Sequence, residues 1–165
     1  MKSNRIVCFT GHRHIDYYDR EDLMISLEIE IERRIQKGAE IFRAGGALGF
    51  DTMAALAVLK LKTKYPHIRL ELILPCPSQT QNWASADVKR YKEILRRADS
   101  YLYVSDTYFN GLLQLRNNRL VEGADVCIAY LKHSHGGGSA YTSALAIRSG
   151  LEYVNLLERI GWESV

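Results

Sequence analysis

The sequence predicts an α/β protein with a three-layer, Rossmann-like open sheet, mostly parallel, of about six strands with helices on both faces. Two observations support this prediction. Short apolar, β-rich segments alternate with longer segments of helical periodicity, and glycine-rich segments follow several of the predicted strands. Strand and helix alternation of this kind is typical of a parallel sheet, because each parallel connection requires a crossover. The predicted strands are residues 6–9, 40–42, 70–74, 101–104, 126–131 and 153–156.

The first predicted helix covers residues 20–37. Leu23, Leu27, Ile31 and Ile35 recur four residues apart, acidic residues come early and basic residues late. Gly38 is the expected residue just beyond its carboxyl end.

The second predicted helix, residues 50–64, is apolar on nearly all sides and is therefore expected to be buried, with Pro66 ending it. Three further helices are expected at residues 85–97, 108–121 and 140–149. The chain contains no internal repeat, low-complexity tract or linker composition. Residues 1–165 are accordingly expected to form a single domain.

Composition narrows the class of protein. With 165 residues, 47% hydrophobic and 25% charged, the chain can bury a core without a disulfide or a structural metal. Its three cysteines lack metal-binding or redox spacing, and it has neither an apolar run of about 18 residues nor a signal-type leader. A cytoplasmic protein without membrane segments is expected. The net charge of +3 suits an anionic ligand but is small for a dedicated nucleic-acid binder.

Glycine-rich segments follow three predicted strands, at residues 10–13, 44–51 and 135–142. In an open parallel sheet these segments meet at one edge, where ligands bind at the point of strand-order reversal. For one such segment a tight turn is the simpler interpretation, but three together favour a phosphate site built from backbone N–H groups and helix amino ends.

Two side chains near these glycines have chemistry suited to a nucleotide. Arg13 follows the first strand and would hold a phosphate with two parallel hydrogen bonds. Asp51 has two equally supported roles, as an N-cap of the second helix or as an acceptor for a ribose hydroxyl. The ligand-binding candidates in these segments are Thr10, Gly11, Arg13, Gly45, Gly46, Gly49, Asp51, Gly137, Gly138, Ser139 and Thr142.

No metal site is predicted. His12, His14, His133 and His135 lie in or beside two of the glycine-rich segments, but no carboxylate pattern completes a zinc site around them. The motifs of serine hydrolases and of P-loop NTPases are both missing from the sequence.

The segment Cys8-Phe9-Thr10-Gly11-His12-Arg13 resembles the opening of the YpsA-like proteins, domain family DUF1273 of the SLOG (SMF/DprA-LOG) superfamily. The resemblance continues in order along the chain. It includes residues 75–77, Gln79, Trp83, Tyr91, residues 98–99, Arg116, Asn117, residues 124–125 and residues 137–142.

This resemblance implies a Rossmann-like sheet that binds nucleotides or nucleotide-derived ligands. No cofactor is assigned, and the candidate ligands are nucleotides and NAD- or ADP-ribose-like compounds. It adds Trp83, Arg116 and Asn117 to the ligand-binding candidates, because related proteins carry an Arg-Asn pair at this place. Helical periodicity alone would place the pair on a solvated helix surface. The main functional hypothesis is therefore a nucleotide-binding or nucleotide-sensing protein.

Two alternatives remain open. A phosphoribohydrolase-like enzyme is one, although Tyr141 and Thr142 stand where the LOG enzymes have a glutamate. Its remaining acid-base candidates would be Asp51, Asp106, Glu122 and Asp125. The other is DprA-like binding of single-stranded nucleic acid, for which the residues would be Lys89, Arg90, Lys92, Arg96 and Arg97, near Trp83 and Tyr91. A solvated basic helix is the simpler interpretation of that run.

Oligomeric state also stays open. Apolar side chains in the fourth predicted helix would supply either a homo-oligomer face or part of the core. They are Tyr108, Phe109, Leu112, Leu113 and Leu115.

Overall fold

The computed structural model describes residues 5–132 and 137–160, which form one six-stranded, entirely parallel sheet. The strand order is β4-β3-β2-β1-β5-β6, which confirms the predicted fold class. The strands are β1 (Ile6–Gly11), β2 (Ile41–Ala44), β3 (Arg69–Leu74), β4 (Ser100–Tyr103), β5 (Val126–Tyr130) and β6 (Glu152–Asn155).

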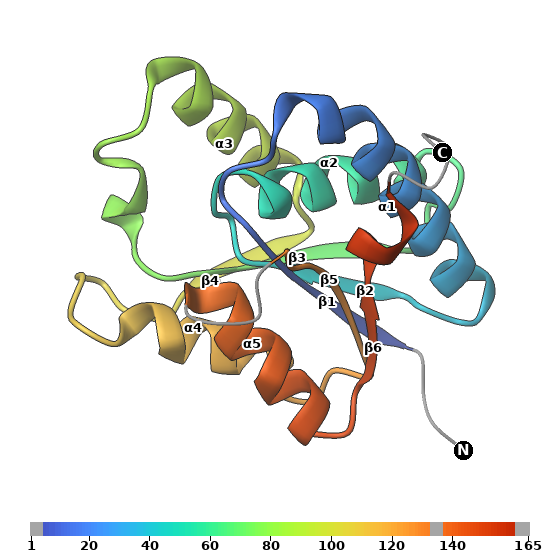
Figure 1. Cartoon of the computed structure of the whole chain (residues 1–165). Coiled ribbons are helices and arrows are strands. Elements are labelled where there is room, and N and C mark those ends of the chain that lie inside the picture. Colours follow the sequence, from blue (N-terminus) through green and yellow to red (C-terminus); the bar gives the residue numbers. More distant parts are fainter. Residues whose placement is uncertain (1–4, 133–136, 161–165) are drawn as a thin grey trace.

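Helices cover both faces of the sheet and make three layers (Figure 1). Helices α1, α2 and α3 lie on one face, and α4 and α5 on the other. A large apolar core lies on the α1–α2 side, and a smaller one lies under α4 and α5. The helices are α1 (Arg20–Gln36), α2 (Phe50–Lys62), α3 (Ser85–Arg97), α4 (Leu112–Val121) and α5 (Gly137–Arg148), with short 3₁₀ turns η1 (Tyr17–Asp19), η2 (Pro77–Thr80) and η3 (Leu156–Arg159).

Several element boundaries differ from the sequence-based prediction. Strand β1 continues to Gly11, because its register with β5 extends to the pairing of Gly11 with Tyr130. Helix α4 begins at Leu112, not 108, because Gly111 has φ +94 and so ends the preceding irregular segment. Helix α5 begins at Gly137, not 140; the low helix propensity of its glycines hides this start in the sequence.

The chain order places a crevice between β1 and β5. In chain order, strands β1 to β4 run from the centre of the sheet to one edge, and the helices that connect them lie on one face. The chain then returns through α4 on the opposite face and adds β5 on the other side of β1. Strand order therefore reverses between β1 and β5, the position at which open parallel sheets bind ligands.

The apolar residues near α4 divide between core and surface. Leu112 is fully buried and Leu113 is partly buried, whereas Tyr108, Phe109 and Leu115 are exposed. All three cysteines are buried and unpaired. Within the described residues, no helix is long and apolar enough to cross a membrane.

A buried ion cluster ties the end of the chain to α1. The Glu30 carboxylate is fully buried and accepts from Arg34 Nε at 2.9 Å and from Arg159 Nη1. Arg34 Nη1 also donates to Glu152 Oε2 at 2.7 Å. Burying charges is costly unless they are paired, and here each charged group has a partner of opposite sign. The cluster therefore holds β6 and η3 against α1.

The loop between β2 and α2 crosses the end of β1 at Gly49. The amide of Phe50 donates to the carbonyl of His12 at 3.0 Å. Gly49 has φ +76, and a Cβ at this position would overlap the carbonyl group of Arg13. Only glycine lets the two backbones approach this closely.

We expect Gly49→Ala to lower the free energy of unfolding by about 3 kcal/mol or more, since it combines left-handed backbone strain with a backbone clash. Urea unfolding measures the loss. Gly38→Ala is the matched control, because Gly38 has φ +105 but open space around it. The control should lose only about 1–2 kcal/mol; equal losses in the two variants would show that the crossing is not tightly constrained.

Candidate functional site

The crevice between the carboxyl ends of β1 and β5 opens into a cavity of about 340 Å³. Side chains and backbone from β1, the β2–α2 loop, α2, α4 and the start of α5 meet there. The lining residues are Phe9, Thr10, Gly11, His12, Arg13, Ala47, Asp51, Leu113, Arg116, Asn117, Leu120, Gly138 and Ser139. Eight of them are candidates named from the sequence: Thr10, Gly11, Arg13, Asp51, Arg116, Asn117, Gly138 and Ser139.

Arg116 is held rigidly at one wall of this cavity. Its side chain is only 5% exposed, its Nη1 donates to the carbonyl of Gly45, and its Nε donates to Asn117 Oδ1 at 2.8 Å. A guanidinium group has five N–H donors, and these two bonds use two of them. The remaining donors are thus available to an anion in the cavity.

Asp51 lies in the first turn of α2 and is 7% exposed. The N-cap of α2 is Gly49, and the Asp51 carboxylate accepts instead from the Ala47 amide at 3.2 Å. The N-cap role considered for Asp51 is therefore wrong, because the side chain turns back toward the loop. Burial raises the pKa of Asp51, while the nearby charges of Arg116 and Arg13 and the Ala47 amide oppose that rise.

Gly45 allows Asp51 and Arg116 to converge. A Cβ on Gly45 would lie 2.8 Å from Asp51 Oδ2 and 2.9 Å from Arg116 Nη1. Any side chain at this position would push the carboxylate and the guanidinium apart. The role of Gly45 is therefore to make room for a buried charged pair beside the cavity.

The charges at the cavity are unequal. Arg13 and Arg116 are two cations, and Asp51 is the one carboxylate among the described lining residues. Burial lowers the pKa of Arg116, with Asp51 opposing this shift and Arg13 adding to it. A second cation close to a buried guanidinium is unfavourable unless an anion lies nearby. The wall of this cavity is thus electrostatically suited to an anionic group.

The amino end of α5 forms the opposite wall. Gly138 and Ser139 line the cavity in the first turn, where backbone N–H groups have no partner within the helix. Asn117 Nδ2 would lie 3.5 Å from a Cβ on Gly138, so α4 and α5 approach closely here. Thr142 is fully buried, and its hydroxyl donates to the Gly138 carbonyl at 2.8 Å. Thr142 therefore supports the start of α5 rather than lining the cavity.

Other predicted site residues lie outside the cavity lining. Gly46 has φ +74 and packs against Leu74, and Trp83 packs edge-on against Tyr91 with ring centroids 5.5 Å apart. Gly45 and Gly49 are not among the lining residues of this cavity, and each permits close packing at its position. Gly137 begins α5 beside Gly138 but is not among the lining residues.

His12 was considered from the sequence only as a metal ligand, yet it lines the cavity. Its Nε2 accepts from the amide of Lys132 at 2.8 Å, which joins the end of β1 to the end of β5. Lys132 Nζ in turn binds Asp16 at 2.9 Å and Asp19 at 2.8 Å. This His12–Lys132 contact holds the ends of the two strands together beside the crevice. Sequence periodicity carries no signal for it, because the two residues are 120 positions apart.

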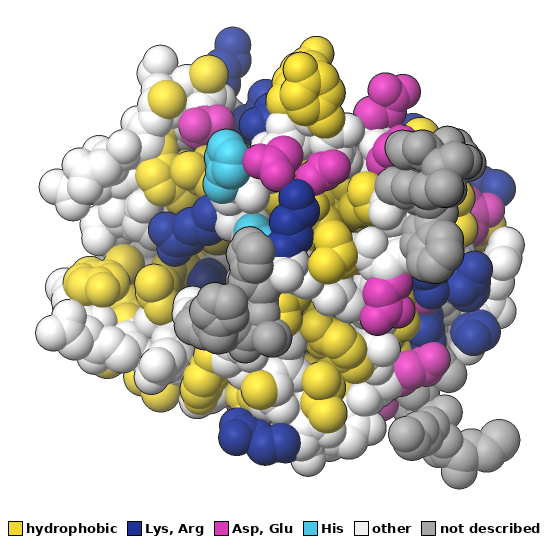
Figure 2. Space-filling model, in the orientation of Figure 1, with side chains coloured by type: hydrophobic (Ala, Val, Ile, Leu, Met, Phe, Trp, Pro, Cys, Tyr) yellow, Lys and Arg dark blue, Asp and Glu magenta, His cyan; other side chains and the backbone are white. Residues whose placement is uncertain are grey.

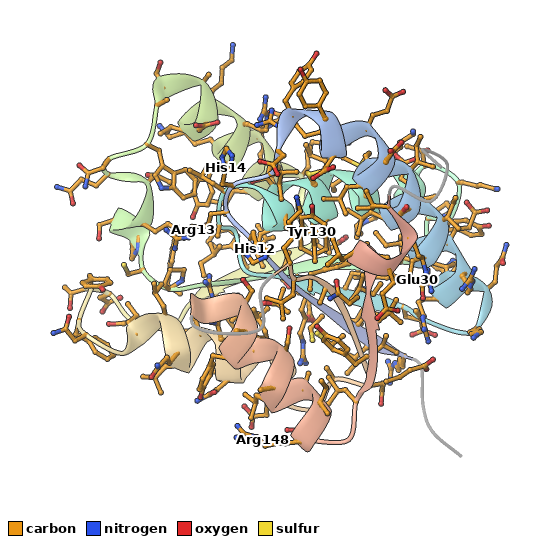
Figure 3. All side chains as sticks on the ribbon, viewed as in Figure 1. His12, Arg13, His14, Glu30, Tyr130 and Arg148 are labelled. Atoms are coloured by element: carbon orange, nitrogen blue, oxygen red, sulfur yellow. The ribbon has the colours of Figure 1, made fainter. Side chains whose placement is uncertain are left out.

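Figure 3 shows His12, Arg13 and Tyr130 together at the crevice, with Arg148 at the far end of α5. In Figure 2, histidine, basic and acidic side chains lie side by side over this region of the surface. His133 and His135 lie outside the described residues. In the described part of the chain, no group of three or more His, Cys, Asp or Glu side chains is arranged to hold a metal ion.

The four carboxylates considered for catalysis are widely separated. Asp51 alone among them lines the cavity. Asp125 accepts from the Ile6 amide at 2.9 Å, at the opposite end of β1, and Glu122 follows the end of α4. Asp106 lies in the exposed segment after β4. No two of these four carboxylates meet at this site.

The strand order and the crevice at its reversal point define an open, doubly wound α/β protein of Rossmann type. Within that class, the model of the YpsA family, described as the YspA SLOG family, matches residues 7–155. The chain belongs to this family.

Curated relatives agree with this assignment. The chain is 33% identical over 133 residues to the UPF0398 protein BH1768 of Halalkalibacterium halodurans, covering 79% of this chain and 68% of that one. It is 32% identical over 139 residues to the UPF0398 protein ABC2016 of Shouchella clausii, covering 82% and 71% respectively.

Two solved structures share the fold. DNA processing protein A (DprA) of Streptococcus pneumoniae gives a TM-score of 0.63 at 15% identity, over 90% of this chain and 49% of that one. DNA processing protein A of Helicobacter pylori, described for its single-stranded DNA binding mode, gives 0.60 at 21% identity, over 94% and 73%. The chain therefore spans about half the length of the pneumococcal protein.

The buried Asp51 carboxylate makes stability depend on pH in a defined direction. The folded-state pKa of Asp51 is raised from 3.8 by burial, so between about pH 4 and that raised pKa the native state binds more protons than the unfolded state. Stability contributed by this group is therefore lost as pH rises through the interval.

As pH rises from about 4 toward 7, we expect the free energy of unfolding of the wild type to fall relative to that of Asp51→Asn. Asparagine keeps an oxygen acceptor for the Ala47 amide but cannot ionise. Urea unfolding at a series of pH values measures this difference, and a difference independent of pH would refute the burial argument.

Proposed function

We propose that the protein binds the phosphate of a nucleotide or nucleotide-derived ligand, with NAD and ADP-ribose as candidate forms, in the crevice between β1 and β5. One observation carries the proposal. A buried, pre-oriented Arg116 and a neighbouring Arg13 face the cavity with only one carboxylate, Asp51, among the described lining residues. This excess of positive charge, opposite the amino end of α5, matches a phosphate.

Each lining group has a role in this proposal. Arg116 would bind phosphate oxygens without a further loss of side-chain conformational entropy, because its hydrogen bonds to Gly45 and Asn117 already fix its position. Arg13 is exposed and would close over the ligand from the rim. Backbone N–H groups of Gly138 and Ser139 would bind the opposite oxygens, and Asp51 would accept from a sugar hydroxyl.

The family supports this proposal through its fold, since a crevice at the strand-order reversal is the usual ligand site of such sheets. Binding of single-stranded nucleic acid is a second candidate function. The observation that favours it is a set of exposed basic side chains on α3: Lys89, Arg90, Lys92, Arg96 and Arg97. A strand of nucleic acid would place one of its phosphates in the crevice.

We expect AMP, NAD or ADP-ribose to raise the melting temperature of the wild type. A ligand at about 100 times its Kd adds about 2.7 kcal/mol of stability. Arg13→Ala should weaken binding by roughly tenfold or more, the effect of losing a charge-assisted hydrogen bond. The thermal shift of each variant measures this loss.

Arg148→Ala is the matched control, because Arg148 is also exposed but lies at the other end of α5 (Figure 3). It should bind ligand as the wild type does. A wild type unaffected by all three ligands, together with salt-sensitive binding of an oligonucleotide, would favour the second candidate function. Equal binding by Arg13→Ala and the wild type would exclude the crevice as the site.

A further inference from the structure

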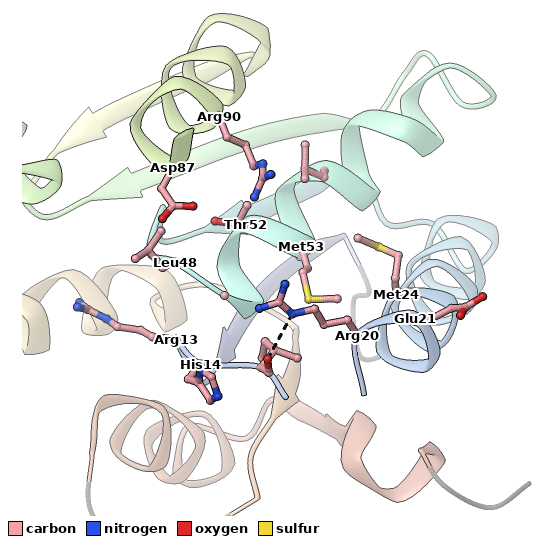
Figure 4. A pocket seen from close by; sticks show the side chains of 13 residues that line it. Arg13, His14, Arg20, Glu21, Met24, Leu48, Thr52, Met53, Asp87 and Arg90 are labelled. Carbon is pink, nitrogen blue, oxygen red and sulfur yellow. Dashed lines mark hydrogen bonds between the residues drawn. The ribbon is translucent and has the colours of Figure 1, made fainter. Parts of the chain in front are cut away.

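A second cavity, of about 460 Å³, lies on the other side of the β1 exit from the phosphate crevice. It is enclosed by the start of α1, the first turns of α2 and the start of α3 (Figure 4). Its lining residues are Arg13, His14, Ile15, Arg20, Glu21, Met24, Leu48, Gly49, Thr52, Met53, Leu56, Asp87 and Arg90. A cavity of this volume is within the range of small-molecule sites.

The walls of this second cavity differ in chemistry. Met24, Met53 and Leu56 supply an apolar surface from α1 and α2. Figure 4 shows the guanidinium of Arg20 beside Met53, with Arg90 reaching down from α3 toward the same space. Arg20 Nε donates to the Ile15 carbonyl at 3.3 Å, which orients that guanidinium. Thioethers and guanidinium planes are both groups that pack favourably against the faces of aromatic rings.

The polar groups of the second cavity are mixed in sign. Three arginines, Arg13, Arg20 and Arg90, accompany two carboxylates, Glu21 and Asp87. Figure 4 shows Asp87 pointing toward Thr52 at the edge of the cavity. A carboxylate in this position suits an amino or ring N–H donor, whereas a purely cationic wall would suit only another phosphate.

The two cavities are neighbours across a single side chain. Arg13 lines both of them. The β2–α2 loop passes between them, so that Ala47 faces the phosphate crevice and Leu48, the next residue, faces the second cavity. A ligand whose phosphate contacts Arg13 therefore has an apolar, arginine-flanked space directly beyond it.

We propose that the second cavity receives the nucleobase of the ligand whose phosphate lies in the crevice, with Met53 beneath the ring and Arg20 and Arg90 along its faces. This inference rests on the proposed phosphate site. It assigns Arg13 to the junction between phosphate and nucleoside, and it makes α3 part of the binding site. The crevice alone would recognise any sugar phosphate, whereas both cavities together select a nucleotide.

The experiment compares AMP with ribose 5-phosphate, which has the same phosphate and sugar but no base. Isothermal titration calorimetry on the wild type should give at least tenfold tighter binding of AMP. Arg90→Ala and Met53→Gln should each weaken AMP binding about fivefold or more and leave ribose 5-phosphate binding unchanged. Arg13→Ala should weaken both.

Arg97→Ala is the matched control for Arg90→Ala, since both are exposed arginines of α3 and only Arg90 lines the second cavity. It should bind both compounds as the wild type does. Because Arg90 is on the surface, its removal tests the inference even if Met53→Gln lowers the melting temperature.

Equal affinity of the wild type for AMP and ribose 5-phosphate would overturn the base cavity and leave the phosphate crevice in place. A preference for AMP that survives both Arg90→Ala and Met53→Gln would also overturn it, because the base would then lie elsewhere. Binding of neither compound would overturn this inference, and the proposed function would fall with it if NAD and ADP-ribose also left the melting temperature unchanged.

Discussion

The site depends on the crossing of two backbone segments at Gly49. Here the β2–α2 loop passes over the end of β1 so closely that a Cβ would overlap the carbonyl of Arg13, and the Phe50 amide bonds to the His12 carbonyl at 3.0 Å. This contact fixes where α2 begins and so positions Asp51. It also fixes the direction in which Arg13 leaves the sheet. The two cavities lie on either side of this crossing, so the boundary between them is formed by backbone and not by side chains alone.

Two groups of charges, each arranged around a buried carboxylate, have different roles. Around Glu30, the cations Arg34 and Arg159 come from within the fold, and the cluster joins α1 to the end of the chain. Around Asp51, the cations Arg13 and Arg116 face a cavity, and positive charge exceeds negative among the described lining residues. Because buried charge must be compensated, the first cluster is suited to stability and the second to an anionic ligand. The excess positive charge of the second group lies at the strand-order reversal.

The relation to DNA processing protein A concerns the fold, at 15% and 21% identity. The crevice alone does not distinguish a free nucleotide from a phosphate of a strand, because the same guanidinium and backbone N–H groups recognise either. The second cavity does make a distinction. Its volume and its Met53 and Arg90 walls suit one base, whereas a basic row along α3 suits an extended backbone. The two modes of binding therefore share Arg90 and differ in whether the other basic side chains of α3 take part.

The sequence by itself determined the fold class, because apolar periodicity and glycine positions are local properties. In β1 and α1, the spacing of the apolar residues follows from which side chains must face the core. It also indicated that glycine-rich segments meet at one sheet edge. Only the tertiary structure decided which residues share a cavity. Gly46 and Trp83 do not line it, whereas His12 does, since side-chain neighbours depend on strand order and on contacts between distant residues. The burial of Arg116 is the clearest case. From the sequence, a charged residue in a helix is expected at the surface, and only the packing of α5 and the Gly45 loop in the tertiary structure buries it.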